Sequence, residues 1–314
     1  MKEANKNFAI IGAGLVGLAA AYRINEKFPS ANIYIVEKES GPAFHQSSHN
    51  SGVIHSGIYY TPGSLKAKNC INGYQYLLQF CEQYNVPYKI TGKLIVATHE
   101  GEEKALRILL KRALENGLEG VKFLSEQETN LIEPAIKVHS SLWVPQTGVI
   151  DFKILADKLC EVLISRGVHI LYNNQVNDIS RNREKLIIHT EHKKLEVDFA
   201  VNCAGLYSDV IAKMAGTKIE HKIIPFRGEY FKLAESAARK INGLIYPVPQ
   251  LGLPFLGVHF TRSIHGEVEA GPNAILSLKR EGYKKWAFSL KDTFETLIFI
   301  GFWRMIFNFR KIGF

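Results

Sequence analysis

Three glycines and one carboxylate have the spacing of a site that binds a diphosphate. Gly12, Gly14 and Gly17 lie in the segment FAIIGAGLVGLAAAYRI, and Glu37 follows the apolar run IYIV, 20 residues after Gly17. Gly12 permits a sharp turn, Gly14 lets the backbone approach a pyrophosphate, and Gly17 lets a helix pack tightly on a strand. The helix start offers N–H groups to phosphates, and the Glu37 carboxylate can accept hydrogen bonds from ribose hydroxyls. The pattern predicts dinucleotide binding, and the alternative is a structural glycine turn.

Hydrophobic periodicity predicts the elements that position this motif. We expect a buried strand over 8–13, a helix over 15–28 and a second strand over 32–37. A long polar, glycine-rich loop follows, which is typical of a functional segment, and then a helix over 64–84.

Later segments indicate a second domain. TGKLIVATHE reads as a strand, and EEKALRILLKRALENG reads as an amphipathic helix closed by Gly117. A further helix begins near Asp151 and stops at Gly167, and AVNCAG looks like the last parallel strand of the first domain. Residues 217–278 alternate short strands with Pro and Gly, as in a mixed or antiparallel sheet. The two domains are therefore expected to interleave.

Composition limits the classes of partner. With 46% hydrophobic and 22% charged residues, the 314-residue chain is ordinary for a globular protein. The net charge of +9 favours acidic small molecules, but no Lys/Arg block of nucleic-acid type occurs, and KLIIHTEHKKLEVD reads as a charged hairpin. The four cysteines, scattered and without a CxxC pair, are typical of a reduced, cytosolic protein without a zinc site or disulfide framework. No signal peptide is apparent, so we expect a cytoplasmic location. The cysteines are Cys70, Cys81, Cys160 and Cys203.

Ten motifs resemble the FAD-dependent oxidoreductases of the D-amino-acid oxidase type, and within that family the group that oxidises L-2-hydroxyglutarate. They cover nearly the whole chain in the family's order, and HNSGVIHSGIYY and PFRGEY are much more specific than the glycine motif. The motifs are HNSGVIHSGIYY (49–60), SLKAK (64–68), GKLIVA (92–97), TGVIDF (147–152), NCAGLYSD (202–209), IPFRGEY (224–230), IYPVP (245–249), PFLGVHFT (254–261), GPNA (271–274) and KREGY (279–283).

The resemblance implies an α/β fold in which a Rossmann-like FAD-binding domain interleaves with a mixed or antiparallel-sheet substrate domain, as in glutathione reductase and D-amino-acid oxidase. The expected domains are residues 1–88 and 147–212 for FAD, residues 89–146 and 213–290 for substrate, and a C-terminal helix over 291–314. The implied reaction oxidises the 2-hydroxyl of L-2-hydroxyglutarate to 2-oxoglutarate, with hydride transfer to flavin N5 and reoxidation by oxygen or a membrane quinone. FAD carries the redox chemistry, and the protein supplies binding and orientation.

Hydride removal from a secondary alcohol calls for a base near the hydroxyl and cations around the carboxylates. His55, in the loop expected to face the flavin, is the candidate base, since imidazole titrates near neutral pH; the alternative is a hydrogen-bonded loop histidine. Arg227 is the candidate carboxylate clamp, because its planar fork suits bidentate binding, and the alternative is an ion pair with an acid such as Glu229. The weaker candidates for the substrate pocket are Tyr59, Tyr60, Tyr246, His259 and Thr261.

The cofactor candidates combine the glycine motif with residues taken from the resemblance. Small polar groups in residues 49–53 are expected along the isoalloxazine ring, where His49 could contact the flavin edge. Small residues after the last parallel strand are expected to leave room for the adenosine or pyrophosphate, although Cys203 could simply pack in the core. The full set is Gly12, Ala13, Gly14, Leu15, Val16, Gly17, Glu37, Lys38, His49, Asn50, Ser51, Gly52, Val53, Val176, Cys203, Ala204 and Gly205.

Relatives of this type continue past the position of Phe314, so we expect a C-terminally truncated chain. The segment FETLIFIGFWRMIFNFRKIGF is too short in its apolar run to span a membrane, which takes about 20 residues. It suits either a core-facing helix or an interfacial helix with peripheral membrane contact. The competing functions are a related flavin oxidase of an amino acid or glycerol 3-phosphate, an inactive flavoprotein remnant, and, least favoured, an NAD-dependent dehydrogenase.

Overall fold

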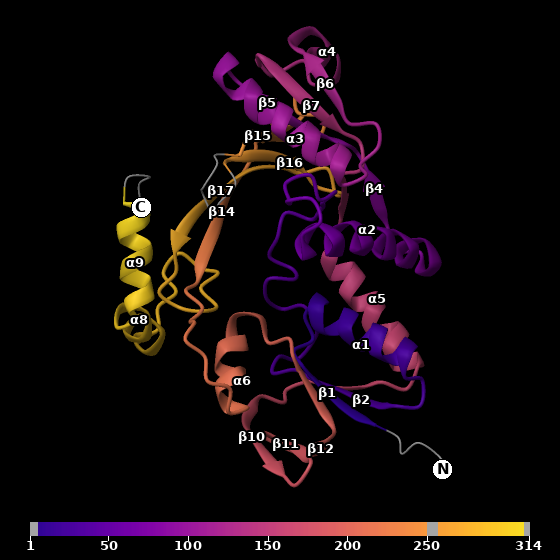
Figure 1. The fold of residues 1–314 in the computed structure, drawn as a ribbon, viewed down its shortest axis with the longest axis vertical. Coiled ribbons are helices and arrows are strands. Elements are labelled where there is room, and N and C mark those ends of the chain that lie inside the picture. The colour runs from indigo at the N-terminus through magenta and orange to yellow at the C-terminus, as the bar shows by residue number, and fades with distance from the viewer. Residues whose placement is uncertain (1–5, 250–256, 311–314) are drawn as a thin grey trace. The chain divides into compact units, whose positions relative to one another are not determined.

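The computed structural model describes residues 6–249 and 257–310 (Figure 1). The chain divides into two compact units, each built from separate segments. Unit 1 consists of Met1–His49, Phe152–Arg227 and Ile275–Phe314, and unit 2 consists of Asn50–Asp151 and Gly228–Ala274.

The boundaries of these units differ from the expected ones. Residues 50–88 belong to unit 2, because β3 (Val53–Ile54) pairs with β8 (Gly148–Ile150), which also pairs with β4 (Tyr88–Ile90). Residues 275–290 belong to unit 1, where Ser277 N donates a hydrogen bond to Pro225 O.

A four-stranded parallel sheet forms the centre of unit 1. Its order is β13-β1-β2-β9, with β1 (Asn7–Ile11) in register with β13 (Phe199–Asn202) on one side and β2 (Asn32–Val36) on the other, and β9 (His169–Leu171) beside β2. The run Phe8–Ile11 is buried, as expected for a parallel strand covered on both faces. AVNCAG therefore supplies the parallel partner of the first strand, as predicted.

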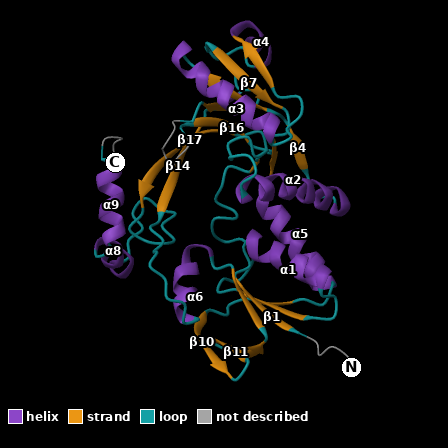
Figure 2. Cartoon of the chain, in the orientation of Figure 1, coloured by secondary structure: helices purple, strands orange, loops and turns teal. Residues whose placement is uncertain are grey.

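Helices and a small second sheet complete unit 1. Helix α1 (Leu15–Lys27) packs beside α5 (Phe152–Ser165), which Gly167 ends in a left-handed conformation (Figure 2). The antiparallel sheet β10-β11-β12 contains the predicted charged hairpin. The remaining elements are β10 (Val176–Asn182), β11 (Lys185–Thr190), β12 (Lys194–Val197), η2 (Gly205–Tyr207), α6 (Ser208–Met214), α8 (Leu290–Leu297) and α9 (Ile300–Phe309).

The expected single C-terminal helix is two short helices, α8 and α9, within the described residues, and the end of the segment, residues 311–314, lies outside them. Among the residues that the structure describes, no helix has the length and apolarity needed to cross a membrane.

Unit 2 is built on a seven-stranded mixed sheet of order β14-β17-β16-β15-β5-β7-β6, beside the small sheet β3-β8-β4. Strand β5, in the interior of this sheet, is buried along its whole length, because α3 covers one face with Leu106 and Leu109 and a second apolar cluster lies on the other. The elements are α2 (Leu65–Tyr84), β5 (Lys93–Ala97), η1 (Glu100–Glu102), α3 (Glu103–Glu115), β6 (Lys122–Ser125), α4 (Glu126–Ile132), β7 (Ser140–Val144), β14 (Phe226–Lys232), α7 (Glu235–Ala238), β15 (Leu244–Pro247), β16 (His259–Arg262) and β17 (Val268–Leu276).

Candidate functional site

The glycine motif forms a tight turn between β1 and α1 in unit 1. Gly12 has a φ of +108°, and a Cβ added there would lie 2.5 Å from the carbonyl oxygen of Cys203. A Cβ added at Gly17 would lie 1.9 Å from the carbonyl oxygen of Gly12. Both positions therefore exclude a side chain, one by backbone conformation and the other by contact of the helix with the turn.

The start of α1 presents amide groups to the space beside this turn. Leu18 N donates to Gly14 O over 3.0 Å, so the amides that precede it have no acceptor within the helix. Leu15 N donates to the Ser47 hydroxyl over 3.0 Å, which leaves the next amides of the first turn pointing along the helix axis. Val16, 73% exposed, lies at this open end. Such a helix start suits an anionic phosphate.

Hydrogen bonds to the Glu37 side chain connect the glycine turn to the end of β2. One carboxylate oxygen accepts a hydrogen bond from Ala13 N over 2.7 Å, and the other accepts one from Glu39 N over 2.9 Å. The side chain is 8% exposed. A carboxylate has about four acceptor positions, so the two that remain can receive ribose hydroxyls. The turn, the helix start and this acid together fit a dinucleotide.

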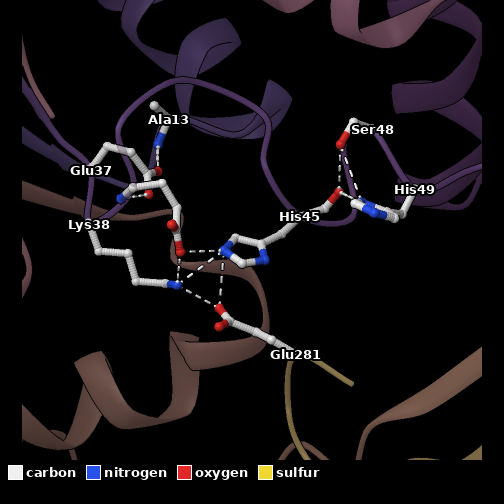
Figure 3. A network of polar contacts seen from close by, with 8 residues as sticks. Ala13, Glu37, Lys38, His45, Ser48, His49 and Glu281 are labelled. Atoms are coloured by element: carbon white, nitrogen blue, oxygen red, sulfur yellow. Dashed lines mark hydrogen bonds and ion pairs between the residues drawn. The ribbon is translucent and has the colours of Figure 1, made fainter. Parts of the chain in front are cut away.

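Lys38 lies at the centre of a network of charged side chains (Figure 3). Its ammonium group forms ion pairs with Glu39 and, over 2.7 Å, with Glu281, while His45 Nε2 lies 3.0 Å from the Glu39 carboxylate and 3.1 Å from that of Glu281. Burial opposes the charged form, but hydrogen bonds to Glu281 and Glu39 outweigh it and raise the pKa of Lys38. The network ties the loop after β2 to the segment that follows β17. In this structure Lys38 is thus paired with acids, and a role in binding coenzyme stays a prediction.

Residues 49–53, predicted to line the flavin, include His49, the last residue of the first segment of unit 1, and the first four residues of unit 2. The His49 ring stacks on Tyr283 with centroids 4.1 Å apart, and its Nδ1 lies 2.9 Å from His45 O. The Asn50 side-chain oxygen accepts a hydrogen bond from Gly52 N, and Gly52 has a φ of +66°. A Cβ added at Gly52 would lie 2.6 Å from Ile150 O. Ser51 follows Asn50 in this turn, and Val53 is buried in β3.

The small residues after β13 lie against the turn. Cys203 N donates to Ile11 O over 2.9 Å, and its Cβ would be 3.3 Å from a Cβ at Gly17. Ala204 packs on the apolar cluster that contains Ile11 and Val176, and Gly205 has a φ of +52°. Val176 is 6% exposed, and its predicted contact with the coenzyme stays a prediction.

Arg227 belongs to unit 1, unlike the other substrate candidates. Its Nη1 donates to Gly282 O over 3.3 Å and to Lys284 O over 3.0 Å. These bonds orient the guanidinium group toward the backbone of the segment after β17. The predicted role as a carboxylate clamp stays a prediction.

Most of the substrate candidates gather in unit 2 around a residue that the sequence analysis did not select, Lys93. Its Nζ lies 4.5 Å from the ring centroid of Tyr59 and 4.8 Å from that of Tyr246, and donates to the Tyr59 hydroxyl over 3.3 Å. His259 stacks on Tyr246 with centroids 3.9 Å apart, and its Nδ1 lies 2.9 Å from Gly257 O. We call these four residues the lysine–tyrosine cluster. Thr261 follows two positions after His259 and is buried, so both occupy the same face of β16.

The candidate base His55 lies within electrostatic reach of this cluster. Burial, and then the charges of Lys93 and His259, lower the pKa of His55 to about 4, although the residue as a whole is exposed to solvent. At neutral pH the imidazole is uncharged, and it can accept a proton. Burial also raises the pKa of Tyr59, and raises that of Tyr246 to about 12, so both phenols keep their protons.

Lys93 was missed because a lysine in a strand usually lies at the solvent face. One signal was available in the sequence: the lysine begins the run KLIVA, whose other four residues are all apolar. Such a run is typical of a strand buried on both faces, which leaves its lysine little access to water. The partner Glu281 of Lys38 had no local signal, since more than two hundred residues separate the two.

Comparison with known proteins gives one family. The family model described as FAD dependent oxidoreductase matches residues 7–296. The chain is 45% identical over 305 residues to an L-2-hydroxyglutarate dehydrogenase of Indibacter alkaliphilus, covering 97% of this chain and 76% of that protein. It is 41% identical over 308 residues to the L-2-hydroxyglutarate dehydrogenase of Escherichia coli K12, covering 98% of this chain and 73% of that protein.

Solved structures share the fold. An L-α-glycerophosphate oxidase from Mycoplasma pneumoniae with FAD bound superposes with a TM-score of 0.79 at 27% identity, covering 88% of this chain and 73% of that one. A glycine oxidase from Geobacillus kaustophilus superposes with a TM-score of 0.74 at 16% identity, covering 87% of this chain and 73% of that one.

Proposed function

Because the chain belongs to the FAD-dependent oxidoreductase family, and within it to the L-2-hydroxyglutarate dehydrogenases, we propose that it oxidises the 2-hydroxyl of L-2-hydroxyglutarate to give 2-oxoglutarate. The observation that carries this proposal is the identity of 38–45% to proteins of that name over more than nine-tenths of the chain. When bound, FAD supplies the hydride acceptor, N5 of its ring system.

Unit 1 has the residues to hold the coenzyme. The amides at the start of α1 bind the pyrophosphate, Gly12 and Gly17 keep the approach clear, and the open acceptor positions of Glu37 bind ribose hydroxyls. The bond from Ala13 N holds the Glu37 carboxylate beside the turn. These assignments are supported by an anion-binding helix start and an acid fixed at the end of the neighbouring strand.

Unit 2 has the residues to hold the hydroxy acid. We assign the hydroxyl proton to His55, whose uncharged imidazole at neutral pH is ready to accept it. The phenols of Tyr59 and Tyr246 keep their protons and can donate hydrogen bonds to substrate oxygens. The buried Thr261 hydroxyl adds a further donor in β16.

The other small acids considered for this fold have weaker support. The match to the glycerophosphate oxidase is 27% identical, and the match to the glycine oxidase is 16% identical. Both likenesses are well below the identity to the L-2-hydroxyglutarate dehydrogenases. The comparisons therefore favour a 2-hydroxy dicarboxylic acid over glycerol 3-phosphate or an amino acid.

The test is reduction of the bound flavin under nitrogen. The purified full chain, loaded with FAD, is mixed separately with L-2-hydroxyglutarate, D-2-hydroxyglutarate, glycerol 3-phosphate and glycine, and the flavin absorbance is followed. We expect bleaching by L-2-hydroxyglutarate alone, with 2-oxoglutarate formed in equal amount. Bleaching by another acid instead, or by none, refutes the proposal.

The acceptor that reoxidises the flavin is oxygen or a membrane quinone, as the family resemblance implies. Oxygen consumption and reduction of a soluble quinone analogue, measured in parallel on the substrate-reduced protein, distinguish the two.

A further inference from the structure

Lys93 is a buried lysine that no acid balances within the part of the chain that the structure describes. The residue is 1% exposed, and no carboxylate lies within ion-pair distance of its Nζ among the residues that the structure describes. The titratable groups that face it are Tyr59 and His55 from the loop after β3, Cys70 from α2, and Tyr246 and His259 from β15 and β16. None of these is an acid of the carboxylate type.

This arrangement is costly for the protein alone. Removing an ammonium group from water costs several kcal/mol, whereas a cation–π contact returns only about 0.5–2 kcal/mol. The hydrogen bond to Tyr59 uses one of the three N–H donors of Nζ. Burial accordingly lowers the pKa of Lys93 to about 7. A buried basic group without a counter-ion, surrounded by hydrogen-bond donors, is a site for an anion.

The strand arrangement makes the site rigid. Lys93 begins β5, an interior strand of the sheet, and β15 pairs with it in parallel, with Ile245 opposite Leu94 and Tyr246 opposite Ile95. β16 pairs with β15 on the far side, so that Tyr246 and His259 come from adjacent strands (Figure 1). Sheet hydrogen bonds therefore hold the backbones of Lys93, Tyr246 and His259 in place, and Tyr59 reaches the cluster from the loop after β3.

We propose that Lys93 pairs with a carboxylate group of the substrate, in the lysine–tyrosine cluster of unit 2. The assignment rests on the proposed function for the identity of the substrate, a dicarboxylic hydroxy acid. The substrate carboxylate supplies the negative charge that the cluster lacks. The Tyr59 phenol, which accepts a hydrogen bond from Nζ, donates its own proton in a hydrogen bond to the same carboxylate. The cluster thus acts in recognition, and the hydroxyl proton remains assigned to His55.

The first test compares Lys93→Met with Lys89→Met, a matched change of an exposed lysine on β4 in the same unit. We expect Lys93→Met to raise KM for L-2-hydroxyglutarate about 30-fold or more, the cost of removing one partner of a buried charge pair. Its kcat should change much less, because the ion pair exists in both ground and transition states. Lys93→Met should melt at or above the temperature of the parent chain, since it removes an unbalanced charge. Lys89→Met should match the parent in all three quantities.

The second test measures protons. Since the pKa of Lys93 lies near 7 without ligand, binding of an anion raises it, and the complex takes up protons at pH 8. Titration calorimetry of the FAD-loaded chain with 2-oxoglutarate, in two buffers of different ionisation enthalpy, measures this uptake without turnover. We expect a net uptake of roughly one proton in the parent chain and in Lys89→Met, and a loss of most of it in Lys93→Met.

The outcomes separate this inference from the proposed function. If L-2-hydroxyglutarate does not bleach the flavin of the parent chain, the proposed function fails. If it does, and Lys93→Met keeps the parental KM and proton uptake, only the role of Lys93 fails. A loss confined to kcat would also overturn the inference, because it would place Lys93 at the reacting hydroxyl. If Lys93→Met does not fold, the parent chain still provides a test. A parent chain that takes up no protons on binding 2-oxoglutarate at pH 8 rejects the role of Lys93 in pairing with the carboxylate.

Discussion

Replacing Gly17 with alanine tests whether contact between α1 and the turn is what keeps the coenzyme site open. The added Cβ would lie 1.9 Å from Gly12 O, whereas real Cβ contacts are essentially never shorter than 3.0 Å. The helix must therefore move away from the turn by at least about 1 Å, or the turn must distort. Gly12 cannot yield easily, because its own φ is +108° and it lies against Cys203.

The expected loss of stability follows from two opposing contributions. Overpacking of this kind costs about 1–3 kcal/mol, while alanine in a helix interior gains about 1 kcal/mol over glycine. The net destabilisation is therefore up to about 2 kcal/mol, which lowers Tm by up to about 8 °C in a unit of this size. Displacing the amides at the start of α1 from a phosphate removes at least one hydrogen bond to a charged group, worth about 1.5–3 kcal/mol, so the Kd for FAD should rise tenfold or more.

Gly73 in α2 provides the control. It too lies inside a helix, but nothing lies within 4 Å of a Cβ added there. Gly73→Ala should therefore stabilise the protein by about 0.5–1 kcal/mol and leave FAD binding unchanged. Thermal melting and titration of the stripped protein with FAD measure both effects. The reasoning is refuted if Gly17→Ala has the same Tm as Gly73→Ala and binds FAD with the same Kd.

Three further changes probe other residues. Glu37→Gln exchanges one carboxylate oxygen for an NH₂ group that cannot accept, so FAD affinity in a fluorescence titration should fall about tenfold; unchanged affinity would remove Glu37 from the coenzyme site. Asp209 forms a buried pair with Arg280 over 2.6 Å. Burial acts to raise the pKa of Asp209, but the hydrogen bonds and charge of Arg280 together with two backbone amides lower it. This pair therefore stabilises the protein above the ordinary aspartate pKa, near 3.9, and the contribution disappears as pH falls through the lowered value. Asp209→Asn should cost about 3–5 kcal/mol in urea unfolding at pH 7, and the difference from the parent should shrink in acid; a constant difference would contradict the pairing. His55→Asn should lower kcat about 10²–10⁴-fold and abolish an acid limb near pH 4 in the pH profile of kcat/KM; a parental profile would exclude His55 as the base.

The turn between β1 and α1, in the candidate coenzyme site, is the part that sequence predicts best, because its geometry is local. The roles of Gly12 and Gly17 depend on a turn and a helix that lie within ten residues, and Glu37 lies at the end of the next strand. Steric rules and helix electrostatics act over such distances without knowledge of the rest of the fold. The strand and helix positions of this region differ from the expected ones by only one or two residues.

The substrate side of the molecule is harder to derive, because it depends on strand order. Lys93 and Tyr246 meet only because β15 pairs with β5 across a separation of about 150 residues, and no local pattern specifies that pairing. The boundaries of the two units depend on the same kind of long-range pairing. Residues 50–88 follow the nucleotide-binding motif directly, yet their strands pair with β8 in unit 2. Long-range register is a property of the assembled sheet rather than of any segment.

The pairing of β1 with β13 has a consequence for the order in which the protein can be made. The first strand of the chain hydrogen-bonds along one edge to residues that leave the ribosome roughly 190 positions later, which at about 5–20 residues per second is a delay of roughly 10–40 s. Throughout that interval Phe8–Ile11 lack one neighbour, and the backbone of an apolar strand is open to pairing with other chains. Nascent protein should therefore depend on chaperones that shield its amino-terminal strand, and coenzyme can lock the nucleotide-binding sheet only after synthesis has passed Asn202.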